Sequence, residues 1–213
     1  MINRSFFQWS AACVFAGALI LGIGYLLRTD IEKELIDTFA GTQALISSIM
    51  VATGSLLFLA GLPALLFAQK LYSSKSGIIA SILSFIGMAA FHLGTLALYF
   101  VLPVLVNHNA ATRALVYSDE PPFPRFAIFW AISLLIQVTG LFWIGIKIWK
   151  NSGSQKPASV LLITGALLFL IAPFIYFPLI KSANTLVMLG FALTAISVLR
   201  SGTKIESSYG LSV

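Results

Sequence analysis

Charged residues and cysteine are scarce in this 213-residue chain. Only 9% of the residues are charged, whereas about a quarter are charged in an ordinary soluble domain. The single cysteine, Cys13, excludes an intrachain disulfide and a CxxC redox pair. Because hydrophobic residues make up 59% of the chain, we expect a lipid bilayer, and not water, to surround most of it.

Chemically active groups are also missing from the apolar runs. No Asp, Glu, Lys or Arg lies in the middle of a run, which excludes an intramembrane carboxylate relay and a Schiff-base lysine. The chain has no HExxH, Gly-x-Ser-x-Gly or P-loop sequence. His92 and His108 would lie about 24 Å apart along a helix, too far to share a haem or metal. We expect no cofactor and no metal, and keep a lipid-modifying enzyme at the outer face, using His108, Asp119 and Glu120, only as a minor alternative.

Six apolar runs are long enough to cross a bilayer, which takes about 20 residues of helix. The sequence therefore predicts an all-α, polytopic transmembrane helix bundle that forms one integral membrane domain over residues 1–213. The expected spans are residues 7–27, 44–68, 77–105, 126–148, 158–177 and 183–199, followed by a short tail at 200–213. Pro173 is expected to kink the fifth span, and Lys181 to Asn184 to form a tight turn before the sixth.

Basic residues near the ends of spans predict the orientation, because they tend to remain in the cytoplasm. With the amino terminus inside, eight of the 13 basic residues lie on the cytoplasmic side and six of the seven acidic residues on the outer side. The eight are Arg4, Lys70, Lys75, Lys147, Lys150, Lys156, Arg200 and Lys204. We therefore expect both termini in the cytoplasm and attribute the net charge of +6 to contact with membrane lipids. Nucleic acid is not expected as a partner, because the basic residues are scattered over separate loops.

Polar residues inside the third and fourth spans are the candidate functional residues. Ser84, His92, Thr95 and Tyr99 lie at helical spacing on one face of the third span. Ser133 and Gln137 share a face of the fourth span, and we expect Gln137 to lie at the depth of His92, within reach of a hydrogen bond. Two readings stay open: these side chains are interhelical contacts, or they line a polar path.

Two further patterns concern packing and internal symmetry. Ala80, Gly87 and Gly94 recur every seven residues of the third span, and such a stripe of small residues lets a neighbouring helix approach closely. The segments 53–59 and 164–170 are similar in sequence, as they would be in an inverted repeat of three spans each. Chance similarity between leucine-rich spans is the alternative.

One group of segments resembles a known family. These are Leu59-Ala60-Gly61-Leu62-Pro63-Ala64-Leu65-Leu66, then Gln69-Lys70-Leu71, and Val101-Leu102-Pro103-Val104-Leu105. They resemble a group of uncharacterised bacterial six-helix membrane proteins. The resemblance implies a bacterial cytoplasmic membrane and carries no assigned activity.

Two function classes follow. The first is a carrier or channel-like protein for a small neutral solute or lipid, which predicts a water-accessible cavity in the membrane. The second is a non-catalytic membrane component that binds a membrane protein or a second copy of itself, which predicts a dry core and an exposed apolar groove.

Overall fold

The structure is a computed structural model that describes residues 4–27, 42–69, 71, 74–96, 124–151, 155–175 and 179–200. Within these ranges every regular element is helical and there is no strand. The helices are α1 (Arg4–Leu27), α3 (Thr42–Ala68), α4 (Lys75–Leu96), α7 (Pro124–Asn151), α8 (Lys156–Ile175) and α9 (Leu179–Arg200). All six are long and apolar enough to cross a membrane, which confirms the predicted all-α bundle.

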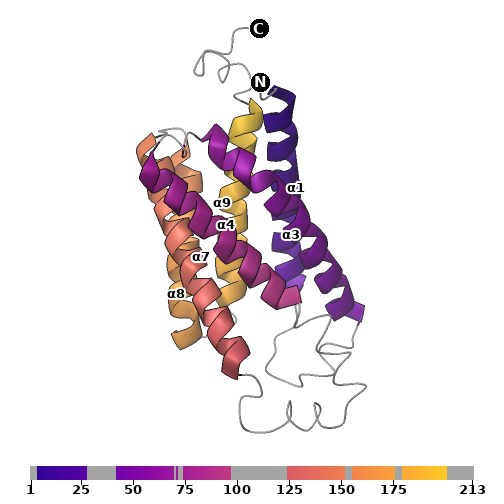
Figure 1. Cartoon of the computed structure of the whole chain (residues 1–213). Coiled ribbons are helices and arrows are strands. Elements are labelled where there is room, and N and C mark those ends of the chain that lie inside the picture. The colour runs from indigo at the N-terminus through magenta and orange to yellow at the C-terminus, as the bar shows by residue number, and fades with distance from the viewer. Residues whose placement is uncertain are drawn as a thin grey trace.

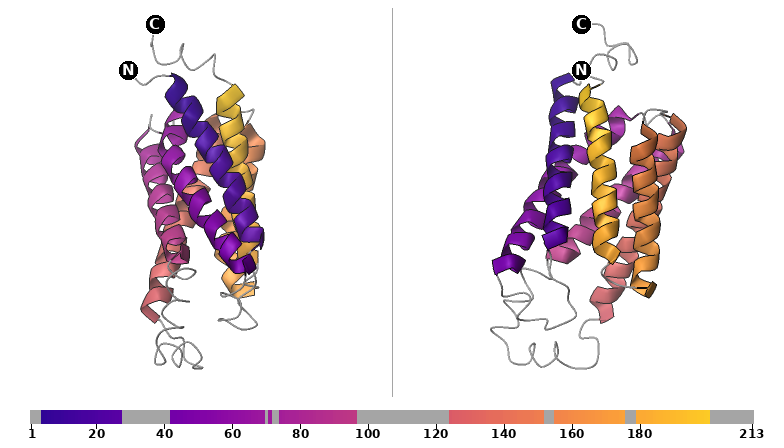
Figure 2. Two further views of the ribbon diagram at one scale, coloured as in Figure 1. Left: turned by 90° about the vertical axis from the view of Figure 1, so that its right-hand side faces the viewer. Right: turned by 180° about the vertical axis from the view of Figure 1, so that it is seen from behind.

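The six helices form a closed ring in the order in which they occur in the chain. Each helix packs against the next, and α9 returns to pack against α1 (Figure 1). The contact between α3 and α4 is the least extensive in the ring. Neighbouring helices are antiparallel, so α1 begins and α9 ends at the same end of the bundle, here called the N/C end (Figure 2). The opposite end is called the far end.

The helix boundaries correct one prediction. The tight turn expected from Lys181 to Asn184 is wrong, because α9 begins at Leu179 and these residues belong to its first turns. A hydrogen bond of 2.9 Å from Thr185 Oγ1 to the Lys181 carbonyl lies within this helix. Pro178 directly precedes α9, and a proline's fixed φ suits the start of a helix. Pro173 lies in the last turn of α8, which ends two residues later. Residues 97–105 of the third predicted span, and 201–213 of the tail, lie outside the described residues.

Small residues determine how closely α1 and α3 approach. Three pairs of them face one another across this antiparallel contact, at steps of seven residues on each helix. The pairs are Ser10 with Gly61, Gly17 with Gly54, and Gly24 with Ser47. The Ser47 hydroxyl donates a hydrogen bond of 2.9 Å to the Gly24 carbonyl. The two backbones are so close that a Cβ on Gly54 would lie 2.7 Å from the Leu21 nitrogen.

Two other helix pairs use the same arrangement. Gly165 on α8 lies against Ala183 and Val187 on α9, and Gly190 on α9 lies against α8 in return. Gly87 on α4 lies against α7, so the close approach predicted for the small-residue stripe of the third span is confirmed at this position, and the neighbour is α7.

The two similar segments have similar burial but different neighbours. In both, the glycine and the phenylalanine four residues later, Phe58 or Phe169, are buried. Gly54, however, packs against α1, the helix before it, whereas Gly165 packs against α9, the helix after it. In an inverted repeat of three spans each, the second span corresponds to the fifth. Both glycines would then pack against the preceding span, or both against the following span. The packing of these two glycines therefore does not support an inverted repeat.

Aromatic side chains fill much of the bundle interior. The rings of Phe58 and Phe191 meet edge to face with centroids 5.0 Å apart, and those of Phe91 and Phe169 meet in the same way at 5.8 Å. Aliphatic side chains such as Leu56, which is 71% exposed, cover the outside of the bundle. Such an apolar exterior is suited to hydrocarbon and not to water.

Candidate functional site

Ser84 and Gln137 lie at the closest contact between α4 and α7. Both side chains are fully buried. Each faces a glycine of the other helix, since a Cβ on Gly87 would meet the backbone of Gln137 and a Cβ on Gly140 would meet Ser84. The two glycines thus create the room in which a serine and a glutamine pack between apolar helices. Gln137 is at the midpoint of α7, far from both ends of that helix.

His92 makes a hydrogen bond that joins α4 to α1 across the bundle. Its Nδ1 lies 3.0 Å from the Tyr25 hydroxyl, and both side chains are buried. Tyr25 is two residues from the end of α1, so this pair lies towards the far end. The other ring nitrogen of His92, Nε2, has no hydrogen-bond partner. It is an unpaired N–H if Tyr25 donates the bond and an unpaired acceptor if Nδ1 donates it.

The hydrogen bond expected between His92 and Gln137 is wrong. Gln137 lies opposite Gly87, five residues before His92 on α4. Five residues correspond to about 7.5 Å along the helix and about 140° around it, so the two side chains differ in depth and in direction. Neither amide atom of Gln137 has a hydrogen-bond partner.

Asn184 is a buried polar residue that the sequence analysis placed in a loop. It is 0% exposed, and neither its Nδ2 nor its Oδ1 has a hydrogen-bond partner. Met188, one turn further along α9, is the nearest neighbour of Gly22 on α1. Because α1 and α9 are antiparallel, Asn184 lies at the depth of Tyr25 to within about one helical turn. The sequence signal that could have identified Asn184 as a buried residue is its position at the start of the sixth apolar run.

The remaining predicted residues divide into two groups. Ser133 is buried, but its hydroxyl donates a 2.8 Å hydrogen bond to the Phe129 carbonyl of its own helix, so it is satisfied locally. The Thr95 side chain and Tyr99 lie outside the described residues. So do His108, Asp119 and Glu120, which were considered for an enzyme at the outer face.

The fully buried polar residues that carry an unpaired side-chain atom are here called the core polar set: Ser84, His92, Gln137 and Asn184, with Tyr25 as the partner of His92. The set extends from the middle of the bundle towards the far end. It offers amide and hydroxyl groups and one imidazole, with no carboxylate or ammonium group. No group of three or more His, Cys, Asp or Glu residues in the described ranges could hold a metal ion. The arrangement is therefore suited to forming hydrogen bonds.

No known protein family, curated protein or solved structure matches this chain. Its function is therefore inferred from the core polar set and from the charges at the two ends of the bundle.

Replacing Tyr25 with phenylalanine should destabilise the folded protein by about 0.6 to 2 kcal/mol, because it removes the partner of a buried ring nitrogen. Unfolding by SDS in mixed micelles measures this change. Thr139→Val is the matched control, since it also deletes one hydroxyl, but Thr139 is exposed and bonds only to the Leu135 carbonyl of its own helix. Equal losses in the two variants would show that the bond between Tyr25 and His92 contributes nothing specific.

Proposed function

We propose that this chain is a carrier or channel-like protein for a small, neutral, hydrogen-bonding solute. The observation that carries the proposal is that six of the seven buried side-chain polar atoms without a hydrogen-bond partner in the described ranges belong to the core polar set. The six are Ser84 Oγ, His92 Nε2, both amide atoms of Gln137 and both amide atoms of Asn184, and the seventh is Gln155 Oε1, just before α8.

An unpaired polar atom in an apolar interior is costly, by about 1 to 3 kcal/mol for each group. A protein that needed these residues only to hold its helices together would pair them, as it pairs Tyr25 with His92. The unpaired atoms of Ser84 and Gln137 lie near the middle of the bundle, and those of His92 and Asn184 lie nearer the far end. Polar molecules that occupy the interior, either water or a solute that replaces it, explain them better.

The chemistry of the core polar set favours a neutral solute. Gln137 and Asn184 each supply two donors and one acceptor oxygen, and Ser84 supplies a hydroxyl. No charged side chain belongs to the set; Lys181, one turn before Asn184 on α9, is the charged residue near it within the described ranges. All four side chains are at most 1% exposed, so a small solute that moves along the bundle axis fits better than a lipid, which would need an opening to the side.

The alternative of a partner-binding membrane component loses one of the two surfaces on which it relied. These were the stripe of Ala80, Gly87 and Gly94 and an outer loop, and the outer loops lie outside the described residues. Gly87 packs against α7 of the same chain, and Ala80 is 0% exposed. The stripe is therefore used inside the bundle.

We further propose that the N/C end faces the cytoplasm, in a bacterial cytoplasmic membrane. Six basic residues of the described helices lie at this end, against Arg125 and Lys181 at the far end. The six are Arg4, Lys75, Lys147, Lys150, Lys156 and Arg200. Their excess at one end agrees with the tendency of basic residues to stay in the cytoplasm.

Cysteine labelling tests the proposal. In a Cys13→Ser background, single cysteines replace Ser84, His92 or Gln137, and a small membrane-impermeant methanethiosulfonate reagent is added to membrane vesicles. We expect all three to react, because water must reach the core polar set. Leu93→Cys, on the lipid-facing side of α4 at 64% exposure, is the control that should stay unreactive.

Two further cysteines report the orientation and validate the assay. Asn151→Cys is exposed at the N/C end and should react only from the cytoplasmic side, whereas Ser182→Cys is exposed at the far end and should react only from the outside. If these controls react as expected while the three core cysteines are protected from both sides, the carrier or channel proposal fails. A reversed pattern in the two controls would contradict the orientation alone.

A further inference from the structure

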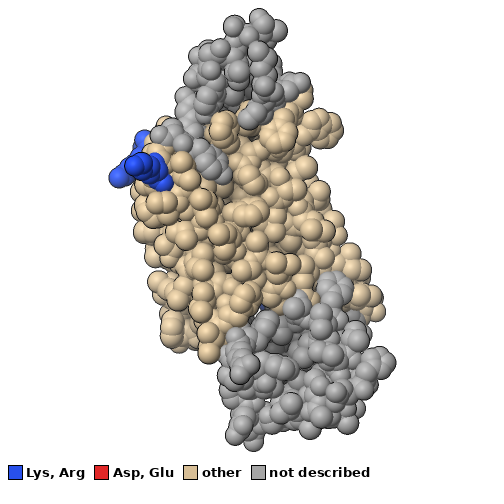
Figure 3. All heavy atoms as spheres, viewed as in Figure 1, with Lys and Arg blue, Asp and Glu red and all other residues tan. Residues whose placement is uncertain are grey.

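Four lysines gather at the N/C end on three consecutive helices of the ring. They are Lys75 at the start of α4, Lys147 and Lys150 at the end of α7, and Lys156 at the start of α8, here called the lysine patch. Basic side chains cluster over this part of the surface in Figure 3, beside the start of α4. All seven acidic residues of the chain lie outside the described ranges, so within those ranges no carboxylate neutralises the patch.

Two of the lysines, Lys147 and Lys156, make specific side-chain contacts. Lys147 Nζ donates a 3.4 Å hydrogen bond to the hydroxyl of Ser74, the residue before Lys75. The same hydroxyl accepts a 3.2 Å hydrogen bond from the Gly77 nitrogen and thereby caps α4. Lys156 Nζ lies 5.4 Å from the centre of the Trp149 ring. The patch is thus assembled by a helix cap and an aromatic ring.

Its electrostatics favour an anion. Lys147 and Lys150 are three residues apart on one helix, where like charges repel. Lys75 also lies in the first turn of α4, and Lys147 Nζ reaches the residue before it, so both charges are near the positive end of that helix dipole, where cations are unfavourable. Three of the four lysines are exposed, so an anion from outside the protein can reach them.

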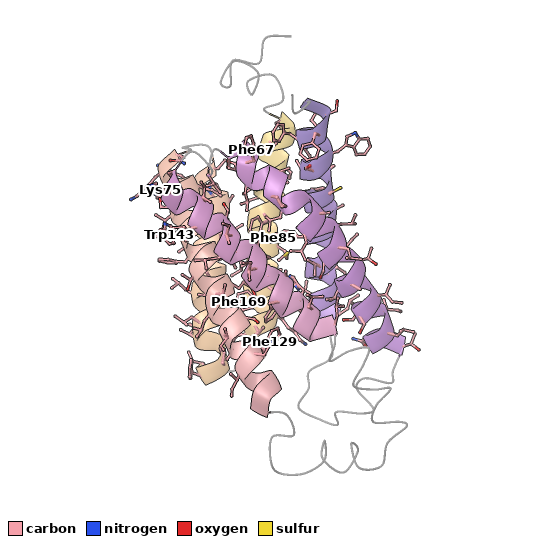
Figure 4. All side chains as sticks on the ribbon, in the orientation of Figure 1. Phe67, Lys75, Phe85, Phe129, Trp143 and Phe169 are labelled. Carbon is pink, nitrogen blue, oxygen red and sulfur yellow. The ribbon has the colours of Figure 1, made fainter. Side chains whose placement is uncertain are left out.

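An apolar track continues directly from the patch along α4. Ile78, Ile79, Ile82 and Ile86 follow Lys75 at helical spacing, and each is between 36% and 50% exposed. Trp143 lies below Lys75 on the neighbouring helix α7 (Figure 4). The surface therefore presents a cationic group at the membrane interface and an uninterrupted hydrocarbon surface beneath it. A free anion would use only the first, whereas a phospholipid uses both.

We propose that the lysine patch is a binding site for one anionic phospholipid. The phosphate lies among Lys75, Lys147 and Lys150, and an acyl chain runs along the isoleucines of α4. Trp149 lies at the level of the headgroup, where aromatic residues are common in membrane proteins. This site is separate from the core polar set and does not depend on the proposed transport function.

Tryptophan quenching tests the site. Trp9, Trp130 and Trp143 are replaced with phenylalanine, and the chain is reconstituted in equal amounts of phosphatidylglycerol and phosphatidylcholine. One lipid at a time is brominated near its headgroup, so that it quenches Trp149 on contact. We expect phosphatidylglycerol to be enriched about fivefold or more over phosphatidylcholine at Trp149, since each nearby lysine favours anionic lipid by about that factor.

Paired variants separate the patch from the general charge of this end. Lys75→Gln with Lys150→Gln should reduce the enrichment to less than about twofold, and the Lys→Arg pair at the same positions should restore it. Arg4→Gln with Arg200→Gln removes the same charge from α1 and α9 and should leave the enrichment unchanged. Equal losses in both glutamine pairs would mean that only the overall charge matters, and would overturn the proposal.

Two outcomes distinguish other sources of the effect. If inorganic phosphate abolishes the enrichment and chloride of equal ionic strength does not, the site binds free phosphate and the lipid assignment is wrong. If the single-tryptophan chain does not reconstitute, native mass spectrometry of the wild-type chain counts the retained lipids in the same mixture. Equal retention of the two lipids would then contradict the site.

Discussion

Replacing Gly17 with alanine is expected to destabilise the folded protein by about 1 to 3 kcal/mol, the usual cost of overpacking. Alanine is the better helix former, so propensity alone predicts stabilisation of up to about 1 kcal/mol. The sign should reverse because a Cβ at position 17 would lie only 2.8 Å from the Gly54 carbonyl oxygen and from the Phe58 Cα. These are backbone atoms, which cannot move without separating α1 from α3.

Gly22→Ala on the same helix is the matched control. Its Cβ would meet nothing closer than the Met188 Cβ at 3.8 Å, an ordinary van der Waals distance. This variant should be as stable as the wild type or slightly more stable. Unfolding of the three proteins by SDS in mixed micelles gives the comparison. Equal stability of the two alanine variants would show that α1 and α3 pack less closely than described.

Replacing Gln137 with methionine should raise the stability of the empty protein by about 1 to 3 kcal/mol, because two unpaired buried amide atoms disappear while the side-chain volume is kept. The same change should block the proposed polar path. A cysteine at position 84, reactive in the Cys13→Ser background, should become protected when Gln137→Met is added. More stability with less water access is the expected signature of a residue kept for function.

Gln155→Met is the contrasting control. Gln155 Nε2 donates a 2.8 Å hydrogen bond to the Ser197 hydroxyl, which links α9 to the start of α8, whereas its Oε1 is buried without a partner. The loss of this hydrogen bond should offset the gain from removing the unpaired oxygen, so Gln155→Met should not share the stabilisation expected for Gln137→Met. A loss of similar size in both variants would mean that Gln137 has a partner in the membrane, and the argument for a solute in the interior would fail.

Much of the candidate site was predictable as a set of residues, but not as a set of contacts. The spacing of Ser84 and His92 predicted one helical face, and both are buried in the structure. The same spacing does not show which neighbouring helix that face meets. His92 therefore received Gln137 as its expected partner, whereas its true partner, Tyr25, lies 67 residues away in the sequence.

The sequence by itself determined that this protein is a bundle of six membrane-spanning helices. That conclusion follows from properties each segment has alone, since hydrocarbon thickness sets the length of an apolar run and the cost of burying charge keeps it uncharged. Only the tertiary structure decided that the six helices close into a ring and that Tyr25 pairs with His92. It also decided that Gln137 and Asn184 are buried without partners. These features depend on the order and register of neighbouring helices, which pairs of small residues such as Gly17 and Gly54 fix between segments.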